Sequence, residues 1–547
     1  MKKILIPALS LFAIGAMAQE TYEGAQIATQ DLNGTAKYIG MGGAMEALGA
    51  DISTINTNPA GIGLFRRSWI GASAGFTSQN GSSDGSKLLT VDYGKSGKTN
   101  ADFNQLGFVY STRTGHDSHI NLAFNYQKNR NFNQIMQAVN TLNGSSANMV
   151  NYIKAYHFPQ SFTMQDDIIN EVVNKKLNYD GDGEVYARGA QGYSAKYDNS
   201  GYISNFDFNI SGSIHDQIYL GLTLGIKDVN YKSVNIYDEM LAYSGNTDGD
   251  LFGFTDVRRI TGTGIDVKLG AVFRPIEDSP FRFGLYINSP TWYDLKCHTN
   301  MSAAAGFDVN YTTDDGNGGT QDHTISYRYA NNTCGYIGDY KYCISTPWRF
   351  GLSMGHTFGK MAAIGVTYEY ADYSAIKNRV VEGSYIDYYG EEHLNTSKDY
   401  QMDENNDISL KGVSTLKIGA EIKPVPELAI RFGYNWQGAI YTDEGFKSYA
   451  IDTDPNYGSV GAYYSTYDFI NWKDTHRLTC GLGINIGKNW ALDLAYQYST
   501  QKGEYYPFTT TVFNDSSSSG TEDMNIGYGT VVHNNRHQFN ATLGYRF

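Results

Sequence analysis

Apolar and polar residues alternate along the C-terminal end of the chain. In His537–Phe547, apolar or aromatic residues occupy every second position, and polar or small residues lie between them. Successive side chains of a β-strand point to opposite faces, so this spacing predicts a strand with one apolar face. The same alternation recurs in Ile218–Ile226, Ile265–Phe273, Leu478–Ile486 and Trp490–Tyr498. Each run has about ten residues, the length that a tilted strand needs to cross a bilayer.

About fourteen such segments follow one another, and the connections between them alternate in length. The segments begin near residues 68, 103, 118, 202, 217, 260, 280, 347, 361, 412, 427, 474, 489 and 536. The short connections are Thr112–Ser118, Ile214–Gln217, Arg274–Pro280, Gly359–Met361, Lys423–Glu427 and Gly487–Asn489. The long connections are 78–102, 131–201, 231–259, 290–346, 375–411, 438–473 and 503–532. Short turns at one end and long loops at the other are typical of bacterial outer-membrane barrels.

This pattern predicts an all-β fold, a 14-stranded antiparallel transmembrane β-barrel. An even number of strands returns the C-terminus to the side at which the first strand enters. Backbone groups in lipid must all be paired, which also requires the barrel to close. The alternative is a soluble β-sandwich or propeller. The regular alternation of long and short connections, and the uniformly small polar faces, favour the barrel.

The segment Gly34–Phe65 does not alternate. It contains seven glycines, and Asn58-Pro59 favours a turn or an extended conformation. We expect a short helix over Gly43–Gly49 and a positive φ at Gly61. An irregular segment is stable only where other groups cover it and pair its backbone. We therefore expect an N-terminal plug, called the hatch below, inside the barrel lumen.

The chain begins with the features of a secretory signal peptide. Lys2 and Lys3 precede the apolar run Ile4–Ile14, and Ala16-Met17-Ala18 forms an A-x-A cleavage site. We therefore divide the chain into a signal peptide over residues 1–18, the hatch over 19–67, and the barrel with long extracellular loops over 68–547. After the signal peptide, the sequence has no apolar run long enough for a transmembrane helix.

The composition fits an exported membrane barrel. The mean hydropathy is −0.41, which is polar for a membrane protein, as expected when apolar residues alternate with polar ones. The formal net charge is −14. An exported acidic chain with no basic tract is a poor nucleic-acid binder, so no nucleic-acid partner is expected.

The residues Gly42, Gly43, Asp51, Asn58, Pro59, Ala60 and Gly61, just before the first strand, form a motif. The segment that carries this motif resembles the hatch of the FadL/TodX family of outer-membrane transporters for long-chain fatty acids and other hydrophobic compounds. The variant is similar to those of Bacteroidota, some of which carry a hemin-receptor label. The strand number and the terminal Phe547 agree, so the resemblance spans the mature chain. The loops 131–201 and 290–346 are long for the family.

The resemblance implies passive uptake of a hydrophobic small molecule in the bacterial outer membrane. The molecule would be captured among the outer loops and would leave through a side opening in the wall. An acyl chain prefers lipid or an apolar pocket to an aqueous lumen by about 0.8 kcal/mol per methylene. In the family, a kinked third strand makes the opening, which here corresponds to about His119–Arg130. No proline or glycine marks a kink there, and the ligand-binding residues are not identified from sequence. No cofactor is implied, and the expected partners are the ligand and outer-membrane lipids.

A second hypothesis is a non-transporting surface or secretion-accessory barrel that binds a protein partner through its loops. Long loops and 44 tyrosines favour a binding surface. Haem uptake is a weaker option, because the histidines are scattered. His533 and His537 lie four positions apart on one strand face, about 13 Å, which is too far for one metal. No catalytic arrangement of side chains is evident, so we do not predict an enzyme.

Charged residues and cysteines raise further candidate sites. Charges on the predicted inward faces either clamp the hatch or pair with one another: Asp207, Asp266, Lys268, Arg282, Glu369, Lys417, Glu421, Arg431 and Asp493. A Cys334–Cys343 disulfide would close a small loop, although Cys297 could replace either partner. Cys480 is expected to face lipid. The acidic clusters 180–184, 246–250 and 314–315 do not fit a calcium loop, so no metal site is predicted.

Overall fold

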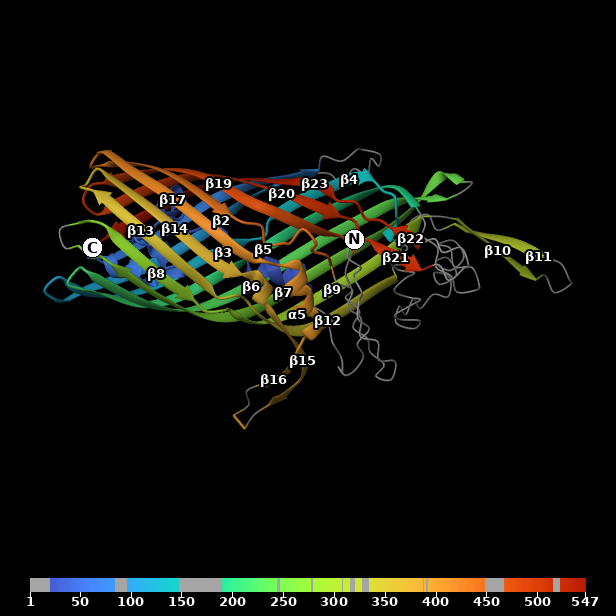
Figure 1. Cartoon of the computed structure of the whole chain (residues 1–547), viewed down its shortest axis with the longest axis horizontal. Coiled ribbons are helices and arrows are strands. Elements are labelled where there is room, and N and C mark those ends of the chain that lie inside the picture. Colours follow the sequence, from blue (N-terminus) through green and yellow to red (C-terminus); the bar gives the residue numbers. More distant parts are fainter. Residues whose placement is uncertain are drawn as a thin grey trace.

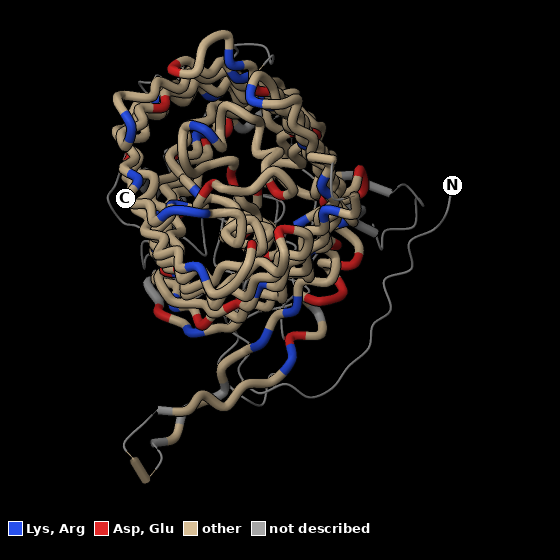
Figure 2. The backbone as a smooth tube through the Cα atoms, turned by 90° about the vertical axis from the view of Figure 1, so that its left-hand side faces the viewer, with Lys and Arg blue, Asp and Glu red and all other residues tan. Residues whose placement is uncertain are grey.

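The computed structural model describes residues 20–83, 96–146, 189–243, 246–276, 279–306, 308–314, 320–326, 334–386, 388–389, 392–447, 467–514 and 522–547. Within them, fourteen antiparallel strands close into the barrel that the sequence predicts. These strands are β1 (Trp69–Ser83), β2 (Gly97–Gly115), β3 (Ser118–Asn131), β5 (Gly189–Ile214), β6 (Ile218–Tyr243), β7 (Asn246–Phe273), β8 (Arg282–Asn288), β13 (Arg349–Phe358), β14 (Ala362–Asp372), β17 (Gly412–Val425), β18 (Leu428–Gln437), β19 (Phe469–Ile486), β20 (Trp490–Tyr506) and β23 (Thr530–Arg546). Each pairs with the next, and β23 pairs with β1 from Trp69↔Arg546 to Ser83↔Val532, which closes the ring (Figures 1 and 2).

The short connections lie together at the end of the barrel where the C-terminus lies (Figure 1). Several contain a residue with positive φ, such as Asp117, His215, Gly359 and Gly487. Tight hairpin turns need such a residue because their backbone must match the twist of the paired strands.

At the other end, some strands run well beyond the bilayer length. The expected long loop 231–259 is wrong, because β6 and β7 stay paired from Ile218↔Phe273 to Tyr243↔Asn246. The acidic cluster 246–250 is therefore the start of a strand. Above the membrane both strand faces contact polar surroundings or protein, so the apolar alternation that marks a strand in lipid is lost.

A belt of apolar side chains surrounds the outside of the barrel. Leu122, Ile210, Leu220 and Leu269 on neighbouring strands are 50–52% exposed. A protein stable in water rarely exposes so continuous an apolar surface, whereas a transmembrane barrel presents it to lipid. Trp292 and Trp348 are also exposed, near the outer edge of this belt. This is the position of aromatic girdles at the membrane interface.

Further elements extend the wall or cover its outer end. They are β4 (Gln134–Thr141), β9 (Trp292–Gly306), β10 (Asp308–Asp314), β11 (Thr320–Ser326), β12 (Cys334–Ser345), β15 (Lys377–Ile386), β16 (Glu392–Lys398), β21 (Thr511–Asn514), β22 (Glu522–Asn525), η3 (Tyr373–Ala375) and α5 (Tyr400–Ser409). The β15–β16 hairpin projects sideways from the barrel (Figure 1). None of the helices in the described part of the chain is long and apolar enough to cross a membrane.

Candidate functional site

The hatch lies inside the barrel as four short helical elements. These are α1 (Thr21–Ala28), α2 (Ala36–Gly40), η1 (Ile52–Asn56) and η2 (Pro59–Leu64). Helix α2 packs against β18, β19, β20 and β23, whereas η2 packs against β3, β5, β6 and β7 on the other side of the ring. Figure 2 shows these turns of chain enclosed by the strands. The hatch therefore fills the bore from wall to wall.

Side chains of the motif cap the short helices of the hatch. Asp51 accepts hydrogen bonds from Ser53 N at 3.0 Å and from Thr35 Oγ1 at 2.8 and 2.9 Å. Asn58 Oδ1 accepts from Ala60 N at 3.1 Å, and Pro59 occupies the first turn of η2. Caps of this kind satisfy backbone donors that a short helix leaves unpaired.

Gly42 and Gly43 form a tight turn, but two other expectations for the glycines of this segment are wrong. Gly42 and Gly43 adopt φ values of 62° and 80° and form the turn after α2. No helix covers Gly43–Gly49, which folds as turns, and the described helix lies before it at Ala36–Gly40. Gly61 does not have a positive φ. It lies inside η2, where a Cβ atom would be 2.5 Å from Thr54 Oγ1, so this position requires the smallest residue.

A row of glycines on the wall receives the backbone of the hatch. Gly355, Gly365, Gly419 and Gly433 are register partners across β13, β14, β17 and β18. A Cβ atom at Gly365, Gly419 or Gly433 would overlap backbone atoms of Ala44, Met41 or Gly42, respectively. The small residues on the polar strand faces therefore let two backbones touch.

Amide side chains on β3 pair with the irregular backbone of the hatch. Asn121 Nδ2 donates to Ile62 O at 2.8 Å, and Gln127 Nε2 donates to Asn33 O at 2.8 Å. From β23, Asn540 Nδ2 donates to Gly34 O, also at 2.8 Å. Buried carbonyl groups without a partner would destabilise the segment, and these amides remove that cost.

The inward charges divide between the two roles that the sequence left open. Lys417 Nζ lies 2.9 Å from Glu46 Oε1 of the hatch, and Arg282 Nη1 donates to Leu48 O at 3.0 Å. These two residues clamp the hatch. The others pair within the wall: Lys268 with Asp207 and Asp266, Arg431 with Glu421 and Asp493, and Glu369 with Arg349.

The wall separates between β2 and β3. Their pairing runs from Gly115↔Ser118 to Gln105↔Gln127 and ends there, although β2 continues back to Gly97. Beyond this point β3 pairs only with β5, with a register shift between Lys128 and Arg130. After Phe132–Asn133 the chain continues as β4, which pairs with β5 in the register of β3 and also lies against β1, where Gln79 Nε2 donates to Ile135 O at 2.8 Å.

The sequence alone did not locate this break, because neither proline nor glycine marks it. The available signal is the asparagine run Asn129, Asn131 and Asn133. Asn131 Oδ1 accepts from Asn133 N at 3.0 Å, at the short interruption between β3 and β4. Asparagine side chains offer the backbone such an alternative to continued strand pairing.

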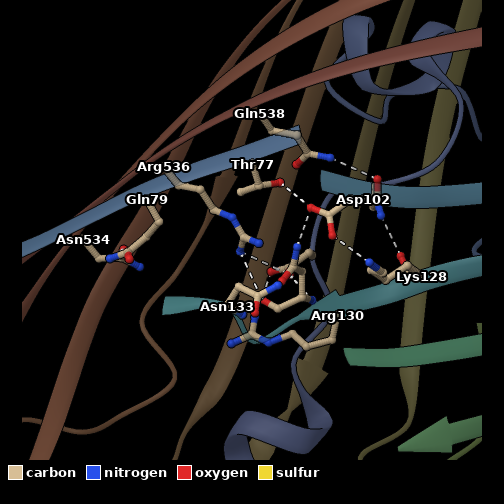
Figure 3. A network of polar contacts seen from close by, with 12 residues as sticks. Thr77, Gln79, Asp102, Lys128, Arg130, Asn133, Asn534, Arg536 and Gln538 are labelled. Carbon is tan, nitrogen blue, oxygen red and sulfur yellow. Dashed lines mark hydrogen bonds and ion pairs between the residues drawn. The ribbon is translucent and has the colours of Figure 1, made fainter. Parts of the chain in front are cut away.

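Polar side chains fill the separation between β2 and β3 (Figure 3). Asp102, on the part of β2 that pairs with β1 but not with β3, accepts from Lys128 Nζ at 2.7 Å, from Asn131 Nδ2 at 2.8 Å and from Thr77 Oγ1 at 2.9 Å. Asn33 of the hatch reaches the same region, donating to Lys128 O at 2.8 Å. The separation is thus closed by side chains rather than by the backbone ladder found in the rest of the ring.

An aromatic cluster closes the outer end of the lumen around helix α1. Tyr22 stacks on Tyr441 at 4.9 Å between ring centroids and contacts Phe469 at 5.3 Å. The same cluster includes Phe132, between β3 and β4, whose ring centroid lies 4.8 Å from that of Tyr231. A hydrophobic cluster of aromatic and aliphatic side chains therefore leads from α1 to the break in the wall.

The cavities described within the lumen are small and mostly polar. One of about 90 Å³ lies beside the β2–β3 separation, and another of about 50 Å³ lies next to it around Asn33 and Lys417. A much larger apolar hollow, of about 930 Å³, lies on the lipid-facing side over β5–β8, β13 and β14. These two lumen cavities are therefore much smaller and more polar than the hollow on the lipid-facing side.

The expected Cys334–Cys343 disulfide is wrong. Both residues lie on β12, nine positions apart, so an extended strand separates them by about 30 Å. Cys343 is a free thiol, and so are Cys297 and Cys480. Cys480 is exposed on the outer face of β19.

Metal binding finds little support among the described residues. No group of three or more His, Cys, Asp or Glu side chains there could hold a metal ion. His537 instead bonds through Nδ1 to Tyr496 OH at 2.8 Å. The acidic cluster 180–184 lies outside the described residues.

Comparison with known proteins gives structural likeness at low sequence identity. No protein-family model matches the chain, and no curated protein matches its sequence. The structure is similar to the toluene transporter TbuX of Ralstonia pickettii, with 13% identity, 94% of this chain and 99% of that chain covered, and a TM-score of 0.44. It is also similar to a FadL homologue of Pseudomonas aeruginosa (11%, 97% and 99%, 0.46) and to the monoaromatic hydrocarbon channel CymD (10%, 95% and 99%, 0.48).

Proposed function

We propose that this protein lies in the bacterial outer membrane, is of the FadL/TodX type, and takes up hydrophobic small molecules passively. The observation that carries the proposal is the break between β2 and β3. It lies in a barrel whose bore the hatch fills, and it adjoins the aromatic cluster that contains Phe132. A straight aqueous path along the axis is blocked, whereas a side path into the lipid needs only side chains to move.

The proposed route of the solute runs along the hydrophobic cluster around α1. A solute that displaces α1 would replace the contacts of Tyr22 with Tyr441 and Phe469 by its own. It would then move along the aromatic cluster to Phe132 and leave between β2 and β3, once Asp102 and Lys128 separate. Each methylene that stays out of water stabilises the bound state by about 0.8 kcal/mol, which favours lateral exit over release into an aqueous lumen.

The test is a reversible lock across the break. In a variant with the four native cysteines replaced, D102C and K128C would be joined by a short bismaleimide with a cleavable linker. Vesicles containing the unlocked protein should take up a long-chain fatty acid faster than empty vesicles. The lock should remove most of this difference, and cleavage should restore it.

The matched control joins S78C and T99C across the neighbouring, continuous pairing of β1 and β2, where the two side chains already lie 2.9 Å apart. This cross-link should not slow uptake. Equal uptake with and without the D102C–K128C lock would contradict the lateral route. Uptake no faster than in empty vesicles, with folded protein, would contradict transport.

A second function is favoured by the small, polar cavities of the lumen. A surface or secretion-accessory barrel that binds a protein partner through its outer elements needs no apolar passage. Such a protein should co-purify with a stoichiometric partner from its native membrane and should give no accelerated uptake in vesicles.

A further inference from the structure

Lysine and arginine side chains stand directly opposite each other at three places on the outward-facing side of the wall. The pairs lie between β6 and β7, between β9 and β12, and between β15 and β16: Lys232↔Arg259, Lys296↔Lys341 and Arg379↔Lys398. All six residues are exposed. Like charges directly opposite on neighbouring strands destabilise a sheet. The registers of the described strands contain no other directly opposed pair of these residue types.

The six residues form one continuous row across neighbouring strands, called the cation row below. The register partner of Arg259 on β9 lies two positions from Lys296. Likewise, the register partner of Arg379 on β12 lies two positions from Lys341. Diagonal neighbours of this kind are about 7–8 Å apart. Each opposed pair therefore lies close to the next pair.

The cation row runs around the barrel parallel to the membrane. From β7 to β15 it shifts by two residues twice, each time toward the inner turns. The inner ends of the strands shift in the same sense, because Met354, level with the end of β7 at Phe273, lies four positions before β13 ends. Such a shift reflects the tilt of barrel strands. Trp292 lies four positions from Lys296 on the same face of β9, so the row lies just outside the aromatic girdle.

The charge of the cation row is only partly balanced. Within four positions of the row, the described carboxylates on the same strand faces are Asp228, Asp294 and Asp339, three against six cations. Asp339 contacts both Lys296 Nζ at 2.8 Å and His298 Nδ1 at 2.6 Å. On the opposite side of the barrel, the first three outward positions above the apolar belt on β1, β20 and β23 hold one lysine, Lys502, and no arginine. The excess is therefore confined to one side of a chain whose net charge is −14.

The apolar hollow of about 930 Å³ lies on the same side, nearer the inner turns. Its lining includes the small residues Gly212 and Ala271, and it reaches Phe350, two positions from the exposed Trp348. Cys343, which is opposite Arg379 of the cation row, precedes Phe350 by seven positions. Seven residues of a strand tilted by about 40° rise about 18 Å. One leaflet contributes about 15 Å of hydrocarbon, so an acyl chain whose headgroup lies at the row reaches the hollow.

We propose that this side of the barrel binds one phosphorylated, multiply acylated lipid of the outer leaflet. Its phosphate groups lie on the cation row, and its acyl chains lie in the apolar hollow. Phosphate oxygens accept charge-assisted hydrogen bonds from lysine and arginine, and the bound anion removes the repulsion within each opposed pair. Clusters of four to eight such residues beside a membrane surface recognise anionic headgroups. The inference goes beyond uptake, because it needs the membrane location but no transport.

The experiment measures lipid binding to the purified full-length protein in a non-ionic detergent. Native mass spectrometry gives the fraction of protein with one bound lipid across a titration. The two probes are lipid A with two phosphate groups and the same lipid A after both phosphate groups have been removed. The phosphorylated form should bind at least about tenfold more tightly, because only its headgroup can bind the cation row.

Two variants locate the headgroup. The first removes one member of each opposed pair: K232Q/K296Q/K398Q. Its control removes three exposed lysines from two inner turns and from the opposite side of the barrel: K360Q/K488Q/K502Q. The first variant should bind phosphorylated lipid A about tenfold or more weakly and the dephosphorylated form as the unchanged protein does. The control should bind both lipids as the unchanged protein does.

A second pair of variants locates the acyl chains. In A271F, a phenyl ring occupies part of the hollow, so the affinity for phosphorylated lipid A should fall several-fold. The matched control is A541F, at an exposed position on the outward face of β23, outside the hollow. It should leave the affinity unchanged.

Equal binding of the two lipids, or normal binding by K232Q/K296Q/K398Q, would overturn the headgroup site. Full displacement of lipid A by millimolar inorganic phosphate would also overturn it, as a site for an adventitious ion only. Normal binding by A271F would overturn the placement of the acyl chains. If the triple variant does not fold, the comparison of the two lipids on the unchanged protein still decides the matter. Uptake by vesicles is a separate measurement, so lipid binding and transport can fail independently.

Discussion

Single residues fix the hatch to the wall through size and hydrogen bonding. Gly419 faces the backbone of Met41, and Asn121 reaches the backbone of η2. In a close-packed interior, a gain of one methyl group forces neighbouring atoms to move. The row of wall glycines and the amide side chains of β3 therefore act together. They bring a strand wall and an irregular segment into contact without leaving backbone groups unpaired.

Gly419→Ala should loosen the hatch. The added Cβ would overlap Met41 O, so we expect a loss of about 1–3 kcal/mol in stability and faster hydrogen exchange in Ala36–Gly43. Exchange followed by mass spectrometry measures this. Gly383→Ala on the projecting hairpin is the matched control, because no atom lies within 4 Å of its new methyl group. Unchanged exchange in Ala36–Gly43 of Gly419→Ala would show that the glycine row does not position the hatch.

At the scale of elements, helix α1 closes the outer end of the lumen, and the charge of its residue Glu23 depends on pH. Glu20 and Glu23 both face Arg258, at 2.9 and 2.6 Å. Burial, and to a lesser degree the charge of Glu20, raises the pKa of Glu23 to about 7 although Arg258 opposes this. The folded protein therefore holds a proton on Glu23 that the unfolded chain releases between pH 4.5 and 7.

It follows that α1 loses stability as the pH rises from 4.5 to 7, and Glu23→Gln should remove this dependence. We expect a change of about 1–3 kcal/mol in the opening free energy of α1 across this range. Hydrogen exchange of the α1 amides, corrected for the intrinsic pH dependence of exchange, measures it. Asp443→Asn, at an exposed carboxylate of the outer rim, should leave the profile as it is. A profile of Glu23→Gln that parallels that of the unchanged protein would contradict the assignment.

At the scale of the whole molecule, the closed barrel is plugged by the hatch, its own N-terminal segment. The barrel strands pair with one another around the ring, and at the β2–β3 boundary the pairing ends although both strands continue. Barrel closure and hatch docking are consequently separate interactions, one made by backbone ladders and the other by side chains and glycine contacts.

Deletion of residues 20–64 should therefore leave a barrel that folds and conducts. The strands that close the ring do not need the hatch for their pairing, and the emptied bore would be lined by the polar and charged side chains now in contact with it. Planar-bilayer recordings should show stepwise ion conductance that the full chain lacks. A folded deletion variant with no conductance would mean that the barrel interior fills itself without the hatch.

The sequence alone determined the fold class, the number of barrel strands and the position of the short turns. Runs such as Ile218–Ile226 must alternate to face lipid on one side and the lumen on the other, so their pattern is local and can be read directly. The irregular composition of Gly34–Phe65 likewise indicated a covered segment. The alternating pattern did not predict the strands above the membrane, where β6 and β7 continue without an apolar face.

Only the tertiary structure decided where the wall opens and which charges meet. The position of the break depends on where β3 stops pairing with β2, after Gln105↔Gln127. The cavity beside it is lined by Asp31, Arg130, Arg477 and Arg536, which come from four distant parts of the chain. Each of these residues has an ordinary local sequence. These charged side chains interact only once the ring closes, because the energy of a charge pair depends on the distance between the two groups in space and not on their positions along the chain.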